Sequence, residues 1–136
     1  MRTHLLDTAI LCEVLVRRTT TTAFVRKLIL SASAATSVVV VGEALERVMG
    51  RDDYEVFRER LIQLQDVVYP YAIDFAVMER YAALRRSMRP PYGPGLIGDI
   101  DTLIAATAIE HGMTLVTMDR DFERVPGLDL LLVPRR

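Results

Sequence analysis

Apolar residues recur along the chain with two spacings, which predict strands alternating with helices. A short strand is expected at residues 3–6, followed by Asp7 and by a helix over residues 9–17, where apolar side chains return at helical spacing. The threonine run at residues 19–22 is expected to be a loop that caps a second helix over residues 23–32. The first part of the chain is therefore predicted to be a strand, an acid and two helices.

The continuous β-branched run at residues 37–41 is typical of a parallel strand that is covered on both faces. Gly42 is expected to end this strand, and Glu43 to open the next helix. An amphipathic pattern predicts a further helix over residues 54–65. Residues 67–72 are expected to form a short or edge strand, because Pro70 has no backbone N–H to donate to a neighbouring strand.

The second half of the chain contains one clear loop, residues 89–96, which is rich in proline and glycine. A helix capped by Asp74 is expected before it. The stretch 98–122 follows and combines an acidic start, an apolar helix, a strand at residues 114–117 and a second acidic segment. A last strand is predicted at residues 128–133, so that strands and helices alternate to the end.

This alternation predicts a single α/β domain over residues 1–136 with a mostly parallel sheet. The composition is 51% hydrophobic and 26% charged, which is ordinary for a globular protein. A net charge of −1 provides no overall field that attracts nucleic acid, so any such role must depend on local arginines or on bound metal.

The only cysteine, Cys12, cannot form an internal disulfide, which favours a reducing compartment such as the cytoplasm. No apolar run reaches the roughly 18 residues that a membrane helix needs, and no signal peptide is evident. We therefore expect no membrane partner.

Acidic residues follow the predicted strands directly at Asp7, Glu43 and Asp119, and Asp101 lies in the first turn of the helix that leads to the Asp119 strand. Since the C-terminal ends of parallel strands share one edge, we expect these four carboxylates to meet there. Like charges raise each other's pKa, and Mg²⁺ or Mn²⁺, which prefers carboxylate and water oxygens, would relieve the repulsion. Such ions activate water and clamp phosphodiesters.

Helix capping is the simpler explanation for any one of these acids alone. Asp99, directly before Ile100, suits an N-cap, and Asp121 suits the cap of a short turn that ends at Arg124. Capping explains Asp101 less well, because its helix already has a cap. Asp7 is also not easily explained in this way, because it ends a buried strand, where an unpaired acid is costly.

Four segments closely resemble the PIN domain, and most of all the VapC toxins of bacterial and archaeal toxin–antitoxin pairs. They are LLDTAIL at 5–11, VVVGEALERV at 39–48, IGDIDTLIAATAIEHGMTLVT at 97–117 and DRDFERVPGLDL at 119–130. The resemblance covers essentially the whole chain in the right order. It implies a PIN-like three-layer α/β/α sandwich with a mostly parallel central sheet.

The resemblance also implies a metal-dependent endoribonuclease that uses Mg²⁺ or Mn²⁺ to cleave tRNA or another structured RNA. Its catalytic and metal-binding residues would be Asp7, Glu43, Asp101 and Asp119, with Thr117, Asp121 and Asp99 in secondary roles. Ala9 and Val40 stand where relatives often carry supporting hydroxyl or amide groups. The expected partners are a small cognate antitoxin, whose tail lies near the acids, and a second copy in a homodimer.

Arginines at Arg85, Arg86 and Arg89 lie just before the loop that leads to Asp99 and are the best candidates for contacts with RNA phosphates; Arg17 and Arg18 are further candidates. Two alternatives stay open at this point. One is a catalytically silent PIN-type binding module, which the intact four-acid set argues against but which the changes at Ala9 and Val40 keep open. The other is a receiver-like phosphoacceptor domain, which would need a lysine at a strand end, whereas Lys27 lies within a predicted helix.

Overall fold

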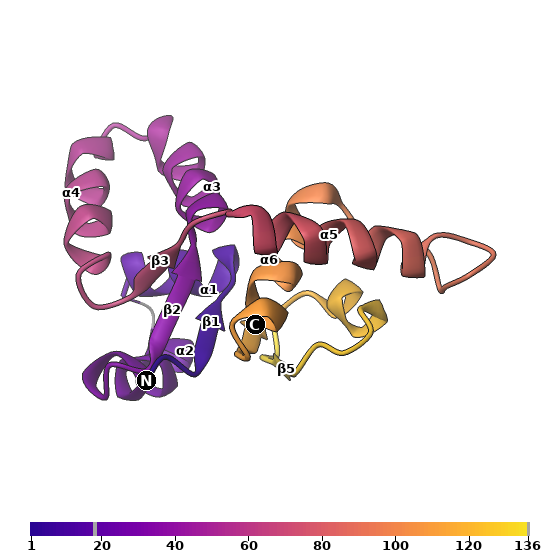
Figure 1. The fold of residues 1–136 in the computed structure, drawn as a ribbon. Coiled ribbons are helices and arrows are strands. Elements are labelled where there is room, and N and C mark those ends of the chain that lie inside the picture. The colour runs from indigo at the N-terminus through magenta and orange to yellow at the C-terminus, as the bar shows by residue number, and fades with distance from the viewer. Residues whose placement is uncertain (18, 136) are drawn as a thin grey trace.

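The computed structural model describes residues 1–17 and 19–135. Its strands form one sheet in the order β3-β2-β1-β4-β5, and every pair of neighbours is parallel (Figure 1). The strands are β1 (His4–Leu6), β2 (Ala34–Ser37), β3 (Tyr69–Tyr71), β4 (Thr114–Thr117) and β5 (Leu130–Leu132). The prediction of a mostly parallel sheet is confirmed.

Helices connect all the strands except the last pair, which a short 3₁₀ turn connects. They are α1 (Thr8–Leu15), α2 (Thr19–Leu30), α3 (Val38–Met49), α4 (Tyr54–Leu64), α5 (Phe75–Met88), α6 (Asp99–Glu110) and the 3₁₀ turn η1 (Arg120–Arg124). The connections through α1–α4 run outward from β1 in one direction, and α5 and α6 lead back past β1 to β4. Because such crossovers are right-handed, the two helix groups cover opposite faces, which gives the expected three-layer α/β/α sandwich.

The centre of the sheet is covered on both faces. Leu5 and Leu6 of β1, and Leu115 and Val116 of β4, are fully buried. Each such side chain contributes roughly 1.5–3 kcal/mol relative to an exposed one. The two central strands therefore form a rigid support for the segments that begin at residues 7 and 118, directly after their C-terminal ends.

The predicted strand at residues 37–41 is wrong. The strand ends at Ser37, and the valine run that follows is the first turn of α3. The Ser37 hydroxyl accepts a hydrogen bond from the Val39 amide (3.3 Å) and so caps the helix. Gly42 therefore lies inside the helix, and Glu43 lies in its second turn instead of opening it. The β-branched run suggested a strand, but the serine cap and the buried helix face decide the structure.

Other differences concern helix ends. The threonine run at residues 19–22 belongs to α2 and is not a loop. The helices α1 and α2 end two residues earlier than predicted, at Leu15 and Leu30. Soon after each end the backbone takes a left-handed conformation, with φ of 58° at Arg17 and 55° at Ala32, which an α-helix cannot continue through.

Several local predictions are confirmed. The proline-containing strand β3 lies at the edge of the sheet, and β4 covers the predicted residues. The Asp74 carboxylate caps α5 by accepting a hydrogen bond from the Val77 amide (3.0 Å).

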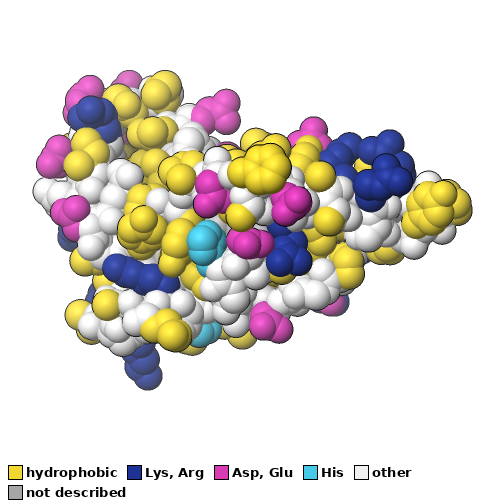
Figure 2. All heavy atoms as spheres, viewed as in Figure 1, with side chains coloured by type: hydrophobic (Ala, Val, Ile, Leu, Met, Phe, Trp, Pro, Cys, Tyr) yellow, Lys and Arg dark blue, Asp and Glu magenta, His cyan; other side chains and the backbone are white. Residues whose placement is uncertain are grey.

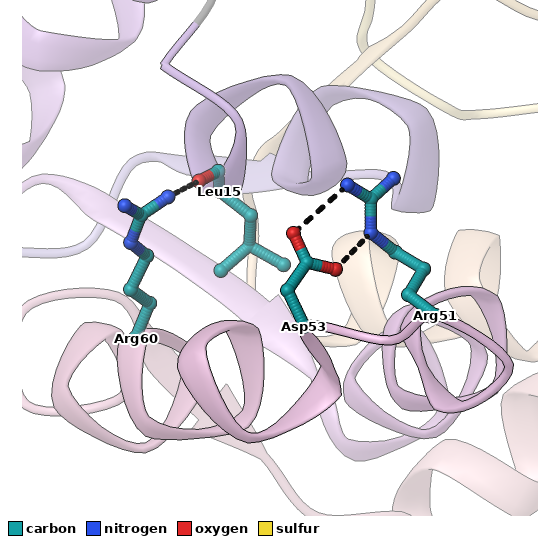
Figure 3. A network of polar contacts seen from close by, with 4 residues as sticks. All are labelled: Leu15, Arg51, Asp53 and Arg60. Atoms are coloured by element: carbon teal, nitrogen blue, oxygen red, sulfur yellow. Dashed lines mark hydrogen bonds and ion pairs between the residues drawn. The ribbon is translucent and has the colours of Figure 1, made fainter.

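Polar contacts are made by α4 and by the turn that precedes it (Figure 3). Arg60 donates to the carbonyl of Leu15 (3.1 Å), which fastens α4 to the end of α1. Asp53 occupies the N-cap position of α4, but its carboxylate pairs with Arg51 (2.8 Å) and makes no capping bond.

Among the residues described, no helix is both long enough and apolar enough to cross a membrane.

Candidate active site

The central strands β1 and β4 each end next to an acid. Asp7 follows β1, and Asp119 follows β4 after one intervening residue. The connection from β1 leads toward one edge of the sheet and the connection from β4 toward the other. In open parallel sheets, this reversal of strand order leaves a crevice at the C-terminal ends, where ligands bind.

One pocket of about 220 Å³ lies at this position. Four carboxylates line it, together with two arginines and three other residues. The lining consists of Asp7, Glu43, Asp101, Asp119, Arg47, Arg135, Thr8, Ala9 and Met118. The structure therefore brings the four acids of the predicted set to one place. Glu43 reaches it from α3 and Asp101 from the first turn of α6.

Asp7 is the most tightly held of these acids, and only 7% of it is exposed. One of its carboxylate oxygens accepts a hydrogen bond from the Thr8 amide (2.8 Å), and the other accepts one from the Thr117 hydroxyl (2.6 Å). Burial raises the pKa of Asp7, the two hydrogen bonds oppose this, and the charges of Glu43 and Asp119 raise the pKa further.

Asp101 has a strongly raised pKa. Burial, as the larger cause, and the carboxylates of Asp7, Asp119 and Glu43 together raise it to about 6. A helix N-terminus normally favours a negative charge. In this pocket, desolvation and repulsion outweigh that preference.

Hydroxyl groups connect the acids across the sheet. The Thr117 hydroxyl donates to Asp7 and accepts a hydrogen bond from the Asp119 amide (3.1 Å), so one buried side chain orients two acids. The Thr8 hydroxyl donates to Glu43 (2.5 Å). Thr8 thus supplies a supporting hydroxyl beside the position where Ala9 lacks one.

Replacing Thr117 by Val is expected to lower the free energy of unfolding by about 1–3 kcal/mol, because it leaves the buried Asp7 carboxylate and the Asp119 amide without this partner. Urea unfolding measures the change. Thr117→Ser keeps the hydroxyl and serves as the control. Equal stability of the Val and Ser variants would contradict the bridging role.

Sequence reasoning missed the three polar residues of the pocket other than the acids: Thr8, Arg47 and Arg135. Arg47 follows Glu43 by four residues on α3, so the same helix face carries both, and this spacing is a signal that was available. Arg135 arrives from the segment after β5, and its position depends on the whole fold. Both arginines place positive charge beside the carboxylates, where a phosphate would otherwise be repelled.

Two predicted secondary acids lie outside this pocket. Gly98 is the N-cap of α6, so the prediction that Asp99 caps this helix is wrong; the Asp99 carboxylate pairs with Arg85 and accepts a hydrogen bond from the Tyr81 hydroxyl (3.3 Å). Asp119 caps the turn η1 by accepting a hydrogen bond from the amide of Asp121 (2.9 Å), so the prediction that Asp121 is that cap is also wrong.

The Asp121 side chain instead pairs with Arg124 (3.2 Å). Such exposed pairs contribute about 0–1 kcal/mol. Asp99 and Asp121 therefore have local partners on the surface, close in sequence to the pocket acids but separate from the pocket lining.

The candidate RNA-binding arginines differ in their surroundings. Arg85 is paired with Asp99, whereas Arg86 and Arg89 are exposed and make no ion pair with any residue that the structure describes. Arg17 lines a separate surface pocket beside α1 and α4. Arg18 lies outside the described residues.

The family model of the PIN domain matches residues 4–128 of the chain. Ribonuclease VapC4 of Mycobacterium tuberculosis is 33% identical over 99 residues, which cover 71% of this chain and 75% of that protein. This match and the fold identify a PIN protein, so the receiver-like alternative is wrong. That residues 1–136 form one domain stays a prediction.

Solved structures share the fold over nearly the full length. VapBC2 from Rickettsia felis, bound to a DNA fragment from its promoter, matches with a TM-score of 0.82 and 23% identity, covering 96% of this chain and 98% of that chain. A toxin–antitoxin complex from Klebsiella pneumoniae matches with a TM-score of 0.66 and 25% identity, covering 95% and 96%. The chain therefore belongs to the PIN domain family, and within that family it is similar to the VapC ribonucleases.

Proposed function

We propose that this protein is a Mg²⁺- or Mn²⁺-dependent endoribonuclease that acts as the toxin of a toxin–antitoxin pair. The observation that carries the proposal is the convergence of four carboxylates on one pocket at the ends of β1 and β4, in a chain similar to Ribonuclease VapC4. The substrate class is RNA, with tRNA or another structured RNA as the expected target. The reducing cytoplasm, which the single cysteine favours, is where we place this activity.

The donor set fits a hard divalent cation. The four pocket acids would hold it, since carboxylate oxygens are the ligands that such ions prefer: Asp7, Asp101, Asp119 and Glu43. Burial raises the pKa of Asp101, and repulsion from the neighbouring carboxylates adds to this, which a bound cation would relieve. When bound, the ion would offset this repulsion and stabilise negative charge on a phosphodiester.

The chain's own residues would orient the reaction. Thr117 holds Asp7 and Thr8 holds Glu43 through hydrogen bonds, so neither carboxylate turns freely. Arg47 and Arg135 line the same pocket and would attract the RNA phosphate toward the acids. The carboxylates would position and deprotonate the attacking water. In-line attack by water leaves a 5′-phosphate and a 3′-hydroxyl.

A cognate antitoxin is the expected protein partner, because the Klebsiella pneumoniae structure that this chain resembles is a toxin–antitoxin complex. The homodimer that the resemblance implies stays a prediction, which sedimentation velocity tests. Expression of the chain without its antitoxin is expected to arrest growth.

Mg²⁺ or Mn²⁺ is expected to raise the melting temperature of the wild type. The free energy of unfolding is expected to increase by about 2.7 kcal/mol when the free ion is at 100 times its dissociation constant. Calorimetry in metal and in EDTA measures this. Glu43→Gln is expected to reduce the shift. Glu46→Gln removes the same charge from an exposed position on the same helix and is expected to retain the shift. Equal shifts in both variants would place the ion elsewhere.

The decisive test is incubation of the purified protein with total RNA in Mg²⁺, in Mn²⁺ and in EDTA. Discrete fragments with 5′-phosphates that appear only with metal support the nuclease. The silent binding module is the second candidate, because no three acidic, histidine or cysteine side chains among the described residues already converge as closely as metal ligands do. Metal binding seen by calorimetry without any RNA cleavage would favour that module.

A further inference from the structure

The segment that joins α5 to α6 extends away from the body of the molecule and is not explained by the acid pocket. In Figure 1 it is the loop that projects beyond the end of α5. We refer to residues 85–97, which comprise the last turn of α5 and this loop, as the arm.

The arm is a folded turn packed on the helix end. The amides of Tyr92 and Gly93 donate hydrogen bonds to the Arg89 carbonyl (2.9 and 3.2 Å), and the Gly95 amide donates one to the Met88 carbonyl (2.8 Å). A Cβ atom at Gly93 would lie 2.1 Å from the carbonyl oxygen of Ser87, so only glycine permits this close packing. Met88 is completely buried beneath it.

This fixed turn displays one aromatic ring and two unneutralised cations. Tyr92 is 82% exposed. Arg86 and Arg89 are exposed and make no ion pair with any part of the chain that the structure covers. Figure 2 shows Lys and Arg side chains gathered beside the apolar tip at the right of the view. The concentration of positive charge is local, because the net charge of the chain is −1.

The arm leads directly into the helix that carries Asp101, one of the four pocket acids. It ends one residue before Gly98, the N-cap of α6, and Asp101 lies in the first turn of that helix. The ion pair between Arg85 and Asp99 fastens the base of the arm to the same turn. A ligand held along the arm would therefore extend toward the four carboxylates.

We propose that the arm binds unpaired nucleotides of the RNA substrate, with Tyr92 stacking on a base and Arg86 and Arg89 contacting phosphates. This inference depends on the proposed nuclease function and assigns to the arm a contact surface for RNA outside the acid pocket. An exposed ring stacks only on a base whose face is free, which a duplex does not offer. Two cations beside the ring match the phosphates on either side of such a base.

The binding test uses the full chain carrying Asp101→Asn, so that RNA is not cut. The probes are a fluorescein-labelled stem–loop RNA with an unpaired loop and a blunt duplex of the same base composition. Tyr92→Ala is expected to weaken stem–loop binding about 5- to 100-fold, and Tyr92→Phe to bind nearly as the parent does, since the ring is kept. Duplex binding is expected to be unchanged in both.

Arg86→Ala and Arg89→Ala are expected to weaken binding of both RNAs and to reduce its salt dependence. Arg58→Ala removes the same charge from an exposed position on α4 and serves as the control. Equal stem–loop affinity of the parent and Tyr92→Ala would overturn the proposal. A changed sedimentation coefficient of Tyr92→Ala with unchanged RNA affinity would also overturn it, because the arm would then contact a second copy.

Cleavage by otherwise wild-type protein separates this inference from the proposed function. The wild type is expected to cut the stem–loop and also a short single-stranded oligonucleotide that spans only the acid pocket. Tyr92→Ala is expected to cut the stem–loop more slowly than the wild type does. Absence of cleavage of either RNA by the wild type contradicts the nuclease, while the affinity measurements still decide the role of the arm. Equal cleavage of the stem–loop by both proteins counts against the arm.

Discussion

Replacing Asp101 by Asn is expected to reduce RNA cleavage by about 10²–10³-fold and, at the same time, to stabilise the metal-free protein at neutral pH. The loss of activity follows from removing one of four carboxylates that line the pocket. The gain in stability follows from removing a charge that the pocket disfavours. Steady-state cleavage and urea unfolding in EDTA measure the two effects on the same preparation.

The pH dependence gives the sign of the stability effect. The pKa of Asp101 is raised from 3.8 to about 6, so the folded protein binds this proton more tightly than the unfolded chain does. Protonated Asp101 therefore contributes to the free energy of unfolding below about pH 4. This contribution is lost as the pH rises toward 6 and is absent at pH 7. Because Asp101 is half-exposed, solvent screening limits the penalty to the order of 1 kcal/mol.

Asp99→Asn is the matched control for this prediction. Asp99 lies in the same helical turn and carries the same charge, but it pairs with Arg85 outside the pocket. Its replacement is expected to cost up to about 1 kcal/mol of stability and to affect cleavage far less. A similar loss of stability in Asp101→Asn would show that Asp101 serves the helix N-terminus, and the simpler capping explanation would then hold.

The parts of the fold that the sequence predicts correctly are those in which local pattern and tertiary burial agree. The strand β4 and the helix α5 have both signals, and the observed structure matches them. The valine run at residues 38–41 has conflicting signals. Its residues favour a strand, but a capping serine precedes it and the core requires a helix face at Val40 and Ala44, which are both fully buried. Tertiary packing decides such cases.

The site shows the same division. Strand ends predict the positions of Asp7 and Asp119, because parallel topology alone brings them to one edge. Glu43 was selected for the wrong structural reason, since it reaches the pocket from the second turn of α3 and not from a strand end. The bonds that orient the acids join distant residues, such as Thr117 with Asp7 across 110 positions, and no local pattern reports them.

Replacing Phe122 by Ala is expected to lower the free energy of unfolding by about 3–5 kcal/mol, the largest stability effect that we predict for the site. Phe122 is 1% exposed and is the buried residue of the turn η1. The other four residues of the turn are exposed, so this ring is its main attachment to the core. Urea unfolding monitored by circular dichroism measures the loss.

The consequence for activity follows from the position of the turn. Asp119 caps η1 and lines the acid pocket, so a turn that detaches from the core releases one of the four carboxylates. Cleavage by Phe122→Ala is therefore expected to fall even at temperatures where the protein is folded. Asp121→Asn, which removes an exposed partner of Arg124, is expected to change stability by no more than about 1 kcal/mol. A Phe122→Ala variant that is as stable and active as Asp121→Asn would show that the turn is held by its charges and not by its buried ring.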